Sequence, residues 1–293
     1  MENTRIKSLS IAVPAPGCVN DCKFCVSKMK DDWKCFGTTD EHLTEDAIRD
    51  AINAGIEHGI KSVIITGTIE PLQNMKMVQR ICKVFREIDP ADVSLEIQTS
   101  LCYGAMTTPY IKKLNDWGVD VVAVSIASFD NEKNFEIMGI PKSRWHSIYD
   151  ALTFINYTPM TLRVCVNVSD VTVKQYAWED YSGQTLTEQL VTKAIWLGTE
   201  QITFRRLYND GSNTPQTKWI KEHELPEEFW DELKSELTNK GVRVNEIDWL
   251  VENRIHIRID EDCMGKQDES RYWVLRPDGK IYLGWDATEP VEM

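Results

Sequence analysis

The stretch Gly-Cys-Val-Asn-Asp-Cys-Lys-Phe-Cys, residues 17–25, holds three cysteines, Cys18, Cys22 and Cys25, at the spacing C-x3-C-x2-C. Three thiolates this close in sequence can converge on one metal centre with little ordering cost. They are also one ligand short of the four that a structural zinc ion or a four-iron cluster takes from a protein. The spacing therefore predicts a metal centre that keeps one coordination position for a molecule that reacts there.

Two other interpretations of these cysteines fit the sequence less well. A structural zinc site needs a fourth Cys or His ligand, and the nearest later candidates, Cys35 and His42, do not form a matching second pair. A disulfide framework is typical of short secreted chains, whereas this chain has 293 residues and starts without the apolar segment of a secretion signal. We therefore expect reduced cysteines and a cytoplasmic location.

Composition and charge narrow the class of protein. The chain is 42% hydrophobic and 27% charged, which is typical of a globular protein with a large core. Its formal net charge of -13 repels phosphate backbones, so we expect no nucleic-acid partner. No apolar run reaches the length of a membrane span, so we expect no membrane partner either.

Apolar patterning predicts six strand–helix units in strict alternation. The strands are expected at residues 8–13, 62–65, 93–99, 119–126, 162–168 and 201–207. The helices are expected between Thr44 and Gly59 and at 72–88, 110–117, 143–155, 186–197 and 226–240. Alternation predicts a parallel sheet with helices outside it, and six units are too few to close an eightfold barrel. The expected fold is α/β, a partial (β/α)6 TIM-like barrel.

The last part of the chain, after residue 241, has a sequence pattern of strands and turns. Residues 254–259 alternate basic and apolar side chains, and strands expected at 272–275 and 280–283 flank the turn sequence Arg-Pro-Asp-Gly at 276–279. We interpret residues 1–241 as the barrel and residues 242–293 as a β-rich C-terminal extension packed on it.

Polar side chains at every second strand position mark the expected inner face of the barrel. They are Glu96 and Gln98 on the third strand, Ser125 on the fourth, Arg163, Cys165 and Asn167 on the fifth, and Thr203 and Arg205 on the sixth. Parallel sheets are usually covered on both faces, so polar residues inside one need a ligand or one another. Glu96 and Arg163 can pair as structure or contact a ligand, and the sequence favours neither.

The cysteine spacing, with the aromatic Phe24 directly before Cys25, resembles the cluster motif of the radical S-adenosylmethionine (SAM) superfamily. The resemblance covers about residues 8–240 and implies the same partial barrel. It also implies one 4Fe-4S cluster held by Cys18, Cys22 and Cys25, with the remaining iron chelating the amino and carboxylate groups of SAM.

Further segments resemble the SAM-binding segments of that superfamily. Residues 66–71, Thr-Gly-Thr-Ile-Glu-Pro, are similar to its Gly-Thr-Gly-Glu-Pro segment, although Ile69 replaces the second glycine. The resemblance assigns cofactor contacts to Gly67, Thr68 and Glu70 there, to the serine-matching Ser125, to the inward Gln98 and Asn167, and to Phe24 beside the adenine. The inward Arg163 and Arg205 complete the expected cofactor-contacting set.

The implied activity is reductive cleavage of SAM to a 5′-deoxyadenosyl radical, which then abstracts hydrogen from a small-molecule or peptide substrate. A flavodoxin- or ferredoxin-type protein would donate the electron, which makes the enzyme an oxidoreductase in the broad sense. The loops at 169–185 and 208–225 are expected to hold substrate at the barrel mouth. Two alternatives stay open: an activating enzyme for a glycyl-radical partner, and a metal- or SAM-binding protein without turnover.

Cys263 is the only cysteine of the expected extension. Relatives of the SPASM type need several cysteines there for auxiliary clusters, so we expect a single cluster. Cys263 lies in a polar turn sequence, where its thiol could return a hydrogen atom to a substrate radical. The alternative is a thiol without a role.

Overall fold

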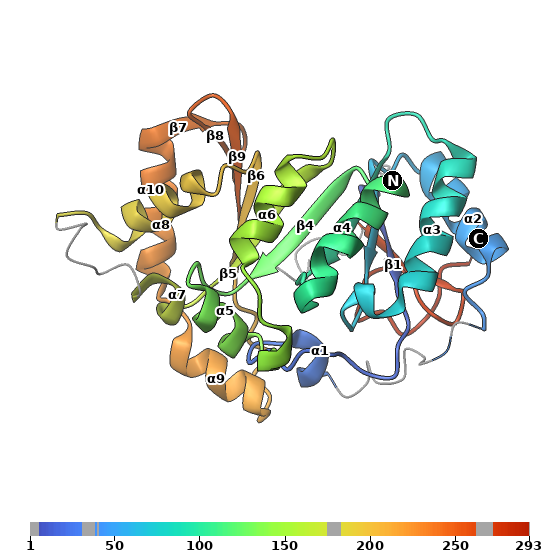
Figure 1. Cartoon of the computed structure of the whole chain (residues 1–293), viewed down its shortest axis with the longest axis horizontal. Coiled ribbons are helices and arrows are strands. Elements are labelled where there is room, and N and C mark those ends of the chain that lie inside the picture. The colour runs from blue at the N-terminus through green and yellow to red at the C-terminus, as the bar shows by residue number, and fades with distance from the viewer. Residues whose placement is uncertain (1–5, 31–38, 40, 175–182, 262–271, 293) are drawn as a thin grey trace.

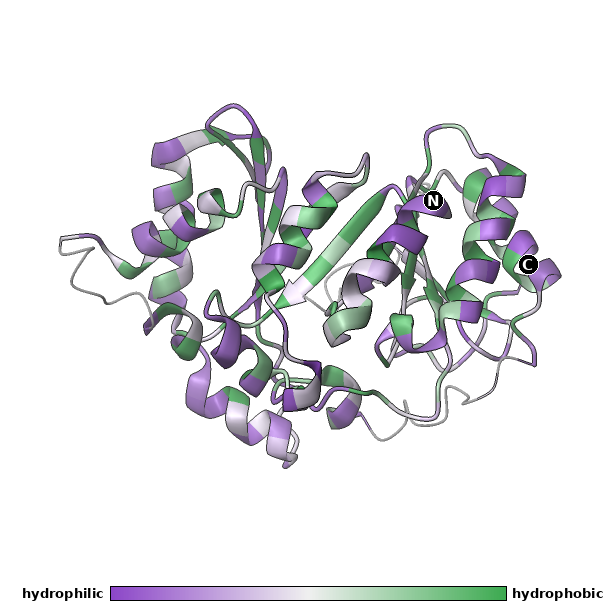
Figure 2. Ribbon diagram, viewed as in Figure 1, coloured by the Kyte–Doolittle hydropathy of each residue, from purple (hydrophilic) through white to green (hydrophobic). Residues whose placement is uncertain are grey.

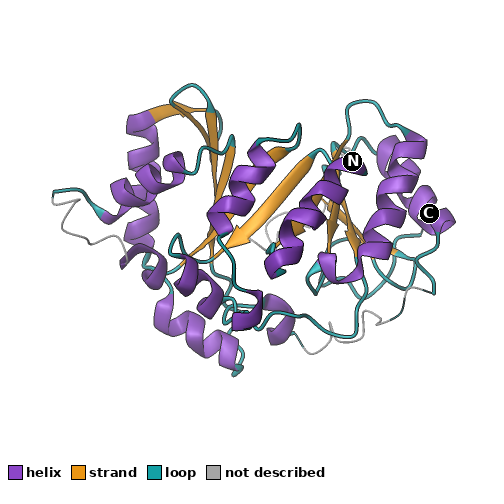
Figure 3. Cartoon of the chain, viewed as in Figure 1, coloured by secondary structure: helices purple, strands orange, loops and turns teal. Residues whose placement is uncertain are grey.

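The computed structural model describes residues 6–30, 39, 41–174, 183–261 and 272–292. Its centre is an 11-stranded sheet in the order β11-β10-β1-β2-β3-β4-β5-β6-β9-β8-β7 (Figures 1 and 3). The first six strands in sequence are β1 (Ser8–Ala12), β2 (Ser62–Thr66), β3 (Ser94–Thr99), β4 (Val121–Ile126), β5 (Thr161–Val168) and β6 (Gln201–Arg206). These six pair in sequence order, and every pair is parallel.

A helix follows each of these six strands on the outer side of the sheet (Figure 1). They are α2 (Glu45–Glu57), α3 (Met75–Ile88), α4 (Thr107–Asp116), α6 (Ile148–Asn156), α8 (Leu186–Trp196) and α10 (Glu227–Lys240). The predicted cap of α2 is present, because the Thr44 hydroxyl accepts a hydrogen bond from the amide of Ala47. The partial barrel predicted from the alternation is confirmed. None of the described helices is both long and apolar enough to cross a bilayer.

Four shorter helices lie at the end of the sheet toward which the β4 arrow points in Figure 1. They are α1 (Val26–Met29), α5 (Asn131–Ile137), α7 (Asp170–Lys174) and α9 (Pro215–His223). The sequence interpretation was wrong to leave 215–223 as loop, because Thr214 and Pro215 form a regular helix start. It also began two helices too early, since Pro71–Asn74 and Lys142–Arg144 are 3-10 turns that precede α3 and α6.

The chain after residue 240 extends the same sheet at both edges. Its strands are β7 (Gly241–Arg243), β8 (Asp248–Val251), β9 (Ile255–Asp260), β10 (Tyr272–Leu275) and β11 (Ile281–Tyr282). β9 pairs parallel with β6, and β10 pairs parallel with β1. The predicted turn at 276–279 joins β10 to β11 in an antiparallel pair. The division at residue 241 stays a prediction about folding units, because the sheet itself is continuous there.

Strand side chains divide into two faces as alternation predicts. Apolar residues such as Leu95, Val122, Val166 and Phe204 are fully buried in the main core between sheet and helices. Hydrophobic residues accordingly concentrate on the central strands and on one side of the helices (Figure 2). The opposite face of the sheet carries the polar residues and is the inner wall of the barrel.

Val166 offers a test of this division. Val166→Ala removes two methyl-sized groups from a fully buried position and should lower the free energy of unfolding by about 2 kcal/mol. Val242, which is 63% exposed, is the matched control, and its alanine variant should unfold with the wild type. Urea unfolding measures both. Equal losses of stability at the two positions would contradict the assignment of the outer face.

Candidate active site

The cysteine loop follows β1 at the carboxyl end of the sheet. Cys18, Cys22 and Cys25 are free thiols, each half-buried, and α1 begins directly after Cys25. Burial raises the pKa of Cys18 and, more strongly, that of Cys22, and the neighbouring thiolates raise both further. A cationic iron–sulfur centre would remove this cost by stabilising the thiolates. The donor set therefore fits a cluster held by these three residues.

A compact mononuclear metal site does not fit as well. Among the described residues, no three His, Cys, Asp or Glu side chains are gathered so that they could hold a single metal ion. In a cubane each thiolate binds a different iron, so its ligands are spread more widely than those of one zinc ion.

Gln73 braces the cysteine loop from the turn that follows β2. Its side-chain oxygen accepts a hydrogen bond of 2.6 Å from the amide of Val19, and its amide nitrogen donates to the carbonyl of Gly17 at 2.7 Å. Asn74 donates in the same way to the carbonyl of Pro14 at 3.1 Å. Sequence reasoning missed both residues, because bonds between segments more than 50 positions apart leave no local pattern.

A second brace comes from the end of α5. The amides of Asp21 and Lys23 donate to the carbonyls of Gly139 and Ile137, at 3.3 and 3.0 Å. Gly139 has a φ of 60°, and a Cβ there would lie closer than 3.0 Å to the Asp21 carbonyl. Only glycine allows the loop to approach this closely.

Glu70 connects the loop to the ends of β2 and β3. Its fully buried carboxylate accepts bonds from the Thr99 hydroxyl (2.6 Å), the Ser100 hydroxyl and amide (2.6 and 2.7 Å) and the Leu72 amide (3.3 Å). Burial raises the pKa of Glu70, and these bonds offset part of that rise. The Ser100 hydroxyl in turn accepts from the Asn20 side chain at 2.8 Å. Glu70 thus has a structural role beside the SAM contact predicted for it.

Gly67 lies where the end of β2 meets the end of β1. A Cβ at Gly67 would come within 3.0 Å of the Val13 carbonyl, and the Val13 amide donates to the Thr66 carbonyl at 2.8 Å. Close backbone approach therefore explains this glycine without a ligand. Thr68 follows it and is half-buried. The predicted SAM contacts of both residues stay predictions.

The inner-wall residues are arranged in rows by the strand register. The row nearest the carboxyl ends aligns Asn167 with Arg205 and then Asp260. One step below, Ser125 aligns with Cys165 and Thr203. The lowest of these rows aligns Gln98 with Arg163 across Ala123. Asn167 and Arg205 are therefore the predicted contacts that lie closest to the cysteine loop along their strands.

Both predicted arginines form ion pairs. Arg163 donates to the buried carboxylate of Glu96 at 2.5 Å and to the side chain of Gln201 at 2.8 Å. This is the structural pairing, one of the two alternatives for Arg163, whose backbone lies about 13 Å along β5 from that of Asn167. Arg205 donates to Asp260 at 3.1 Å, and both side chains are half-buried.

Phe24 links the cysteine loop to α9. It is half-buried and packs against two small apolar clusters, one around Phe135 and one formed by Met29, Leu207 and Ile220. Its ring centroid lies 6.2 Å from that of Trp219 on α9. Trp219 therefore belongs to the wall of the site, and the cap signal at Thr214 could have identified its helix from the sequence. The predicted hydrogen-atom donor, Cys263, lies outside the described residues.

Comparison with known proteins agrees with this architecture. Residues 12–157 match the family model of the radical SAM superfamily. The fold is similar to SuiB of Streptococcus suis bound to S-adenosylmethionine, with a TM-score of 0.58 and 14% identity, over 95% of this chain and 60% of SuiB. It is also similar to anSMEcpe with bound AdoMet, with a TM-score of 0.57 and 15% identity, over 94% of this chain and 73% of anSMEcpe.

At these identities the structural likeness shows the fold alone, and the chain spans about three-fifths of the length of SuiB. A third similar structure, that of HydG, a maturase of the [FeFe]-hydrogenase, has a TM-score of 0.51 and 14% identity, over 78% of this chain and 48% of HydG. No curated protein sequence matches the chain significantly.

Gly139→Ala tests the brace between α5 and the cysteine loop. Alanine at a positive φ costs about 1–2 kcal/mol, and the clash with Asp21 adds to this and displaces the loop. Gly198→Ala is the control, since Gly198 has a φ of 67° and open space around it. After anaerobic reconstitution, only the Gly139 variant should bind less iron per chain. Full iron content in it would show that the brace does not set the loop.

Proposed function

The chain belongs to the radical SAM superfamily, and from this premise we propose that it is an enzyme that cleaves SAM reductively and abstracts hydrogen from a substrate. One observation carries the proposal. Three half-buried thiols stand at the carboxyl end of a partial barrel, on a loop braced by Gln73 and by the end of α5. A metal centre with one open coordination position would suit chemistry on a bound small molecule.

Some residues of the site would bind the cofactors, and others would exclude water from the reaction. Cys18, Cys22 and Cys25 would hold one 4Fe-4S cluster, which together with SAM supplies a 5′-deoxyadenosyl radical. On the inner wall, SAM would form hydrogen bonds with Asn167, Ser125 and Gln98. Phe24 would pack beside the adenine of SAM. The surrounding apolar clusters exclude water, so that a reactive species meets only the intended substrate.

The comparisons support a proposal for the substrate class. The sheet of the described strands is open, with β11 and β7 at its ends, and Tyr282 of β11 forms an antiparallel bridge with Pro290. SuiB has been solved with the precursor peptide SuiA, and anSMEcpe with the Cp18Cys peptide. We propose a peptide or a small polar molecule as substrate, with the segments after β5 and β6 at the mouth as its contacts.

The remaining parts of the proposal concern partners and location. A flavodoxin- or ferredoxin-type protein would supply the electron, and the cytoplasm would supply the reducing conditions that keep the thiols free. Activation of a glycyl-radical protein is the second catalytic candidate, but no described surface favours it. A SAM-binding protein without turnover is the non-enzymatic candidate, and it predicts SAM binding without formation of 5′-deoxyadenosine.

Cys18→Ala tests the cluster assignment. Losing one of three ligands should abolish the brown chromophore and the dithionite-dependent formation of 5′-deoxyadenosine after anaerobic reconstitution. Cys82→Ala is the control, because Cys82 is buried in the main core far from the motif in sequence. Iron and sulfide content, absorption and product chromatography measure the effect. Retention of both chromophore and cleavage by the Cys18 variant would refute the assignment.

Asn167→Ala and Ser125→Ala test the inner wall. Each should weaken SAM binding by about 0.5–1.5 kcal/mol, the net value of one neutral hydrogen bond. Val166→Ala, which faces the opposite side of the same strand, should reduce stability and leave SAM affinity unchanged. Isothermal titration without reductant gives the affinities. Equal losses at Val166 and Asn167 would contradict the proposed binding face.

A further inference from the structure

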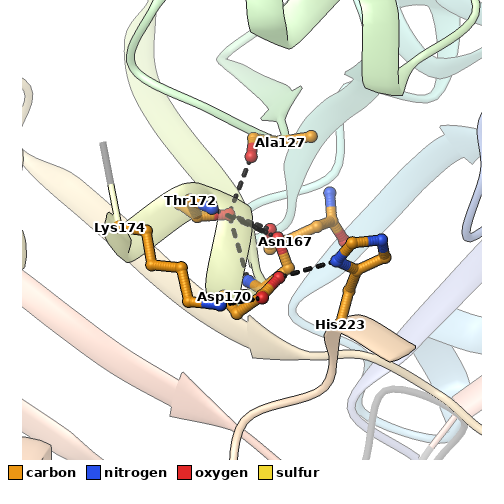
Figure 4. Close-up of polar contacts among 7 residues, drawn as sticks. Ala127, Asn167, Asp170, Thr172, Lys174 and His223 are labelled. Carbon is orange, nitrogen blue, oxygen red and sulfur yellow. Dashed lines mark hydrogen bonds and ion pairs between the residues drawn. The ribbon is translucent and has the colours of Figure 1, made fainter. Parts of the chain in front are cut away.

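A histidine–aspartate pair lies at the mouth of the barrel, between the end of β5 and the end of α9 (Figure 4). Nδ1 of His223 is 2.8 Å from one carboxylate oxygen of Asp170, and Lys174 binds the other oxygen at 2.6 Å. The His223 and Asp170 side chains are only 27% and 19% exposed. Neither His223 nor Asp170 has a role in the cluster site or the SAM site proposed above.

The pair fixes which nitrogen of His223 carries the proton. Burial alone would raise the pKa of Asp170, but the bonds from Lys174 and His223 outweigh it and lower that pKa, so the carboxylate is ionised and can only accept. Nδ1 must therefore carry the hydrogen, and in the neutral ring Nε2 is left as an acceptor. Nε2 has no hydrogen-bond partner among the described residues. The neutral imidazole therefore carries an acceptor that no described residue uses.

Aromatic contacts connect this ring to the cysteine loop. The His223 ring lies against Trp219 at a tilt of 37°, with centroids 4.5 Å apart, and Trp219 contacts Phe24. Trp219 therefore links His223 to Phe24 through ring contacts.

The Asp170 end of the pair is held to the inner wall. The Thr172 hydroxyl donates to the carbonyl of Ala127 at 2.8 Å and lies 3.3 Å from that of Asn167 (Figure 4). The turn that carries Asp170 is therefore fixed against the ends of β4 and β5. Since Asn167 is a proposed SAM contact, both ends of the pair are anchored to residues of the same site.

We propose that His223 contacts the nucleoside of SAM, with Nε2 accepting a hydrogen bond from an N–H or O–H of the adenosine, and that Asp170 is the positioning residue that keeps Nε2 an acceptor. The inference rests on the proposed function. Adenosine offers both kinds of donor, in its amino group and its ribose hydroxyls, and its flat base can pack against an aromatic ring such as Trp219, which contacts both Phe24 and His223.

The test measures SAM affinity of the reconstituted protein without reductant, so that no turnover occurs. His223→Phe keeps a ring against Trp219 and removes Nε2, and it should weaken SAM binding roughly two- to tenfold. Asp170→Asn should weaken it less, because an amide can accept from or donate to Nδ1 and no longer selects one tautomer. Lys174→Ala removes only the partner on the outer side, 71% exposed, and should leave affinity unchanged.

Two further readouts separate ligand contact from a structural role. Nitrogen-15 spectra of the protein before reconstitution should show His223 protonated on Nδ1 in the wild type and in the Lys174 variant, and mixed tautomers in the Asp170 variant. SAM analogues lacking the 6-amino group or one ribose hydroxyl identify the donor. The analogue that lacks this donor should bind the wild type more weakly than SAM does. It should bind His223→Phe as tightly as SAM binds that variant.

The outcomes are distinguishable. Wild-type affinity in His223→Phe, at an unchanged melting temperature, would overturn the inference and leave the proposed function intact. Equal weakening by the Lys174 variant would also overturn it, because the pair would then only hold α7 in place. Failure of the reconstituted wild type to bind SAM would overturn both the proposed function and the inference that rests on it.

Discussion

The buried carboxylate of Glu70 joins three segments that must meet for the site to exist. Its four hydrogen bonds tie the loop after β2 to the end of β3. The Ser100 hydroxyl also accepts a hydrogen bond from Asn20, which lies in the cysteine loop. Burying an ion costs several kcal/mol, and each bond to a charged acceptor returns about 1.5–3 kcal/mol. The four bonds together therefore offset the cost of burying the carboxylate. An amide in place of the carboxylate could not accept from every donor.

The same network concentrates negative charge beside the cysteines. The Glu70 carboxylate raises the pKa of Cys18, the Cys18 and Cys25 thiolates raise that of Cys22, and Lys28 opposes the rise at Cys22 only weakly. Three ionised thiols would therefore strain this loop unless a cation balanced them. In the proposed function an iron–sulfur cluster would supply that cation, so cluster binding and the folded loop would stabilise each other. The hydrogen bonds of Gln73 and Gly139 hold the backbone of the cysteine loop in place.

The sequence predicted the features that repeat along the chain or that depend on neighbouring residues. Strand alternation predicted both faces of the barrel, and residues such as Ile97 and Phe204 lie in the core as expected. It did not reveal the braces, since Gln73 and Gly139 act on backbone groups distant in sequence and no pattern around them marks a partner. The short helices were missed for a related reason, because four to nine residues hold too few turns to establish a period. Trp219 and His223 could be assigned to the mouth only once α9 was placed there.

The last strands explain why the site depends on residues far from its motif. β1 carries the cysteines at its end, and it is flanked by β2 on one side and by β10 on the other. The pairing of β1 with β10 joins the two ends of the described chain, so it closes the largest loop in the fold and has the highest entropic cost. Apolar contacts repay that cost, since Trp273 and Leu275 enter the same core as Leu9 and Ile11. The strand that positions the cysteine loop is therefore held on both sides only when the C-terminal strands are in place, which couples the geometry of the site to the folding of the whole sheet.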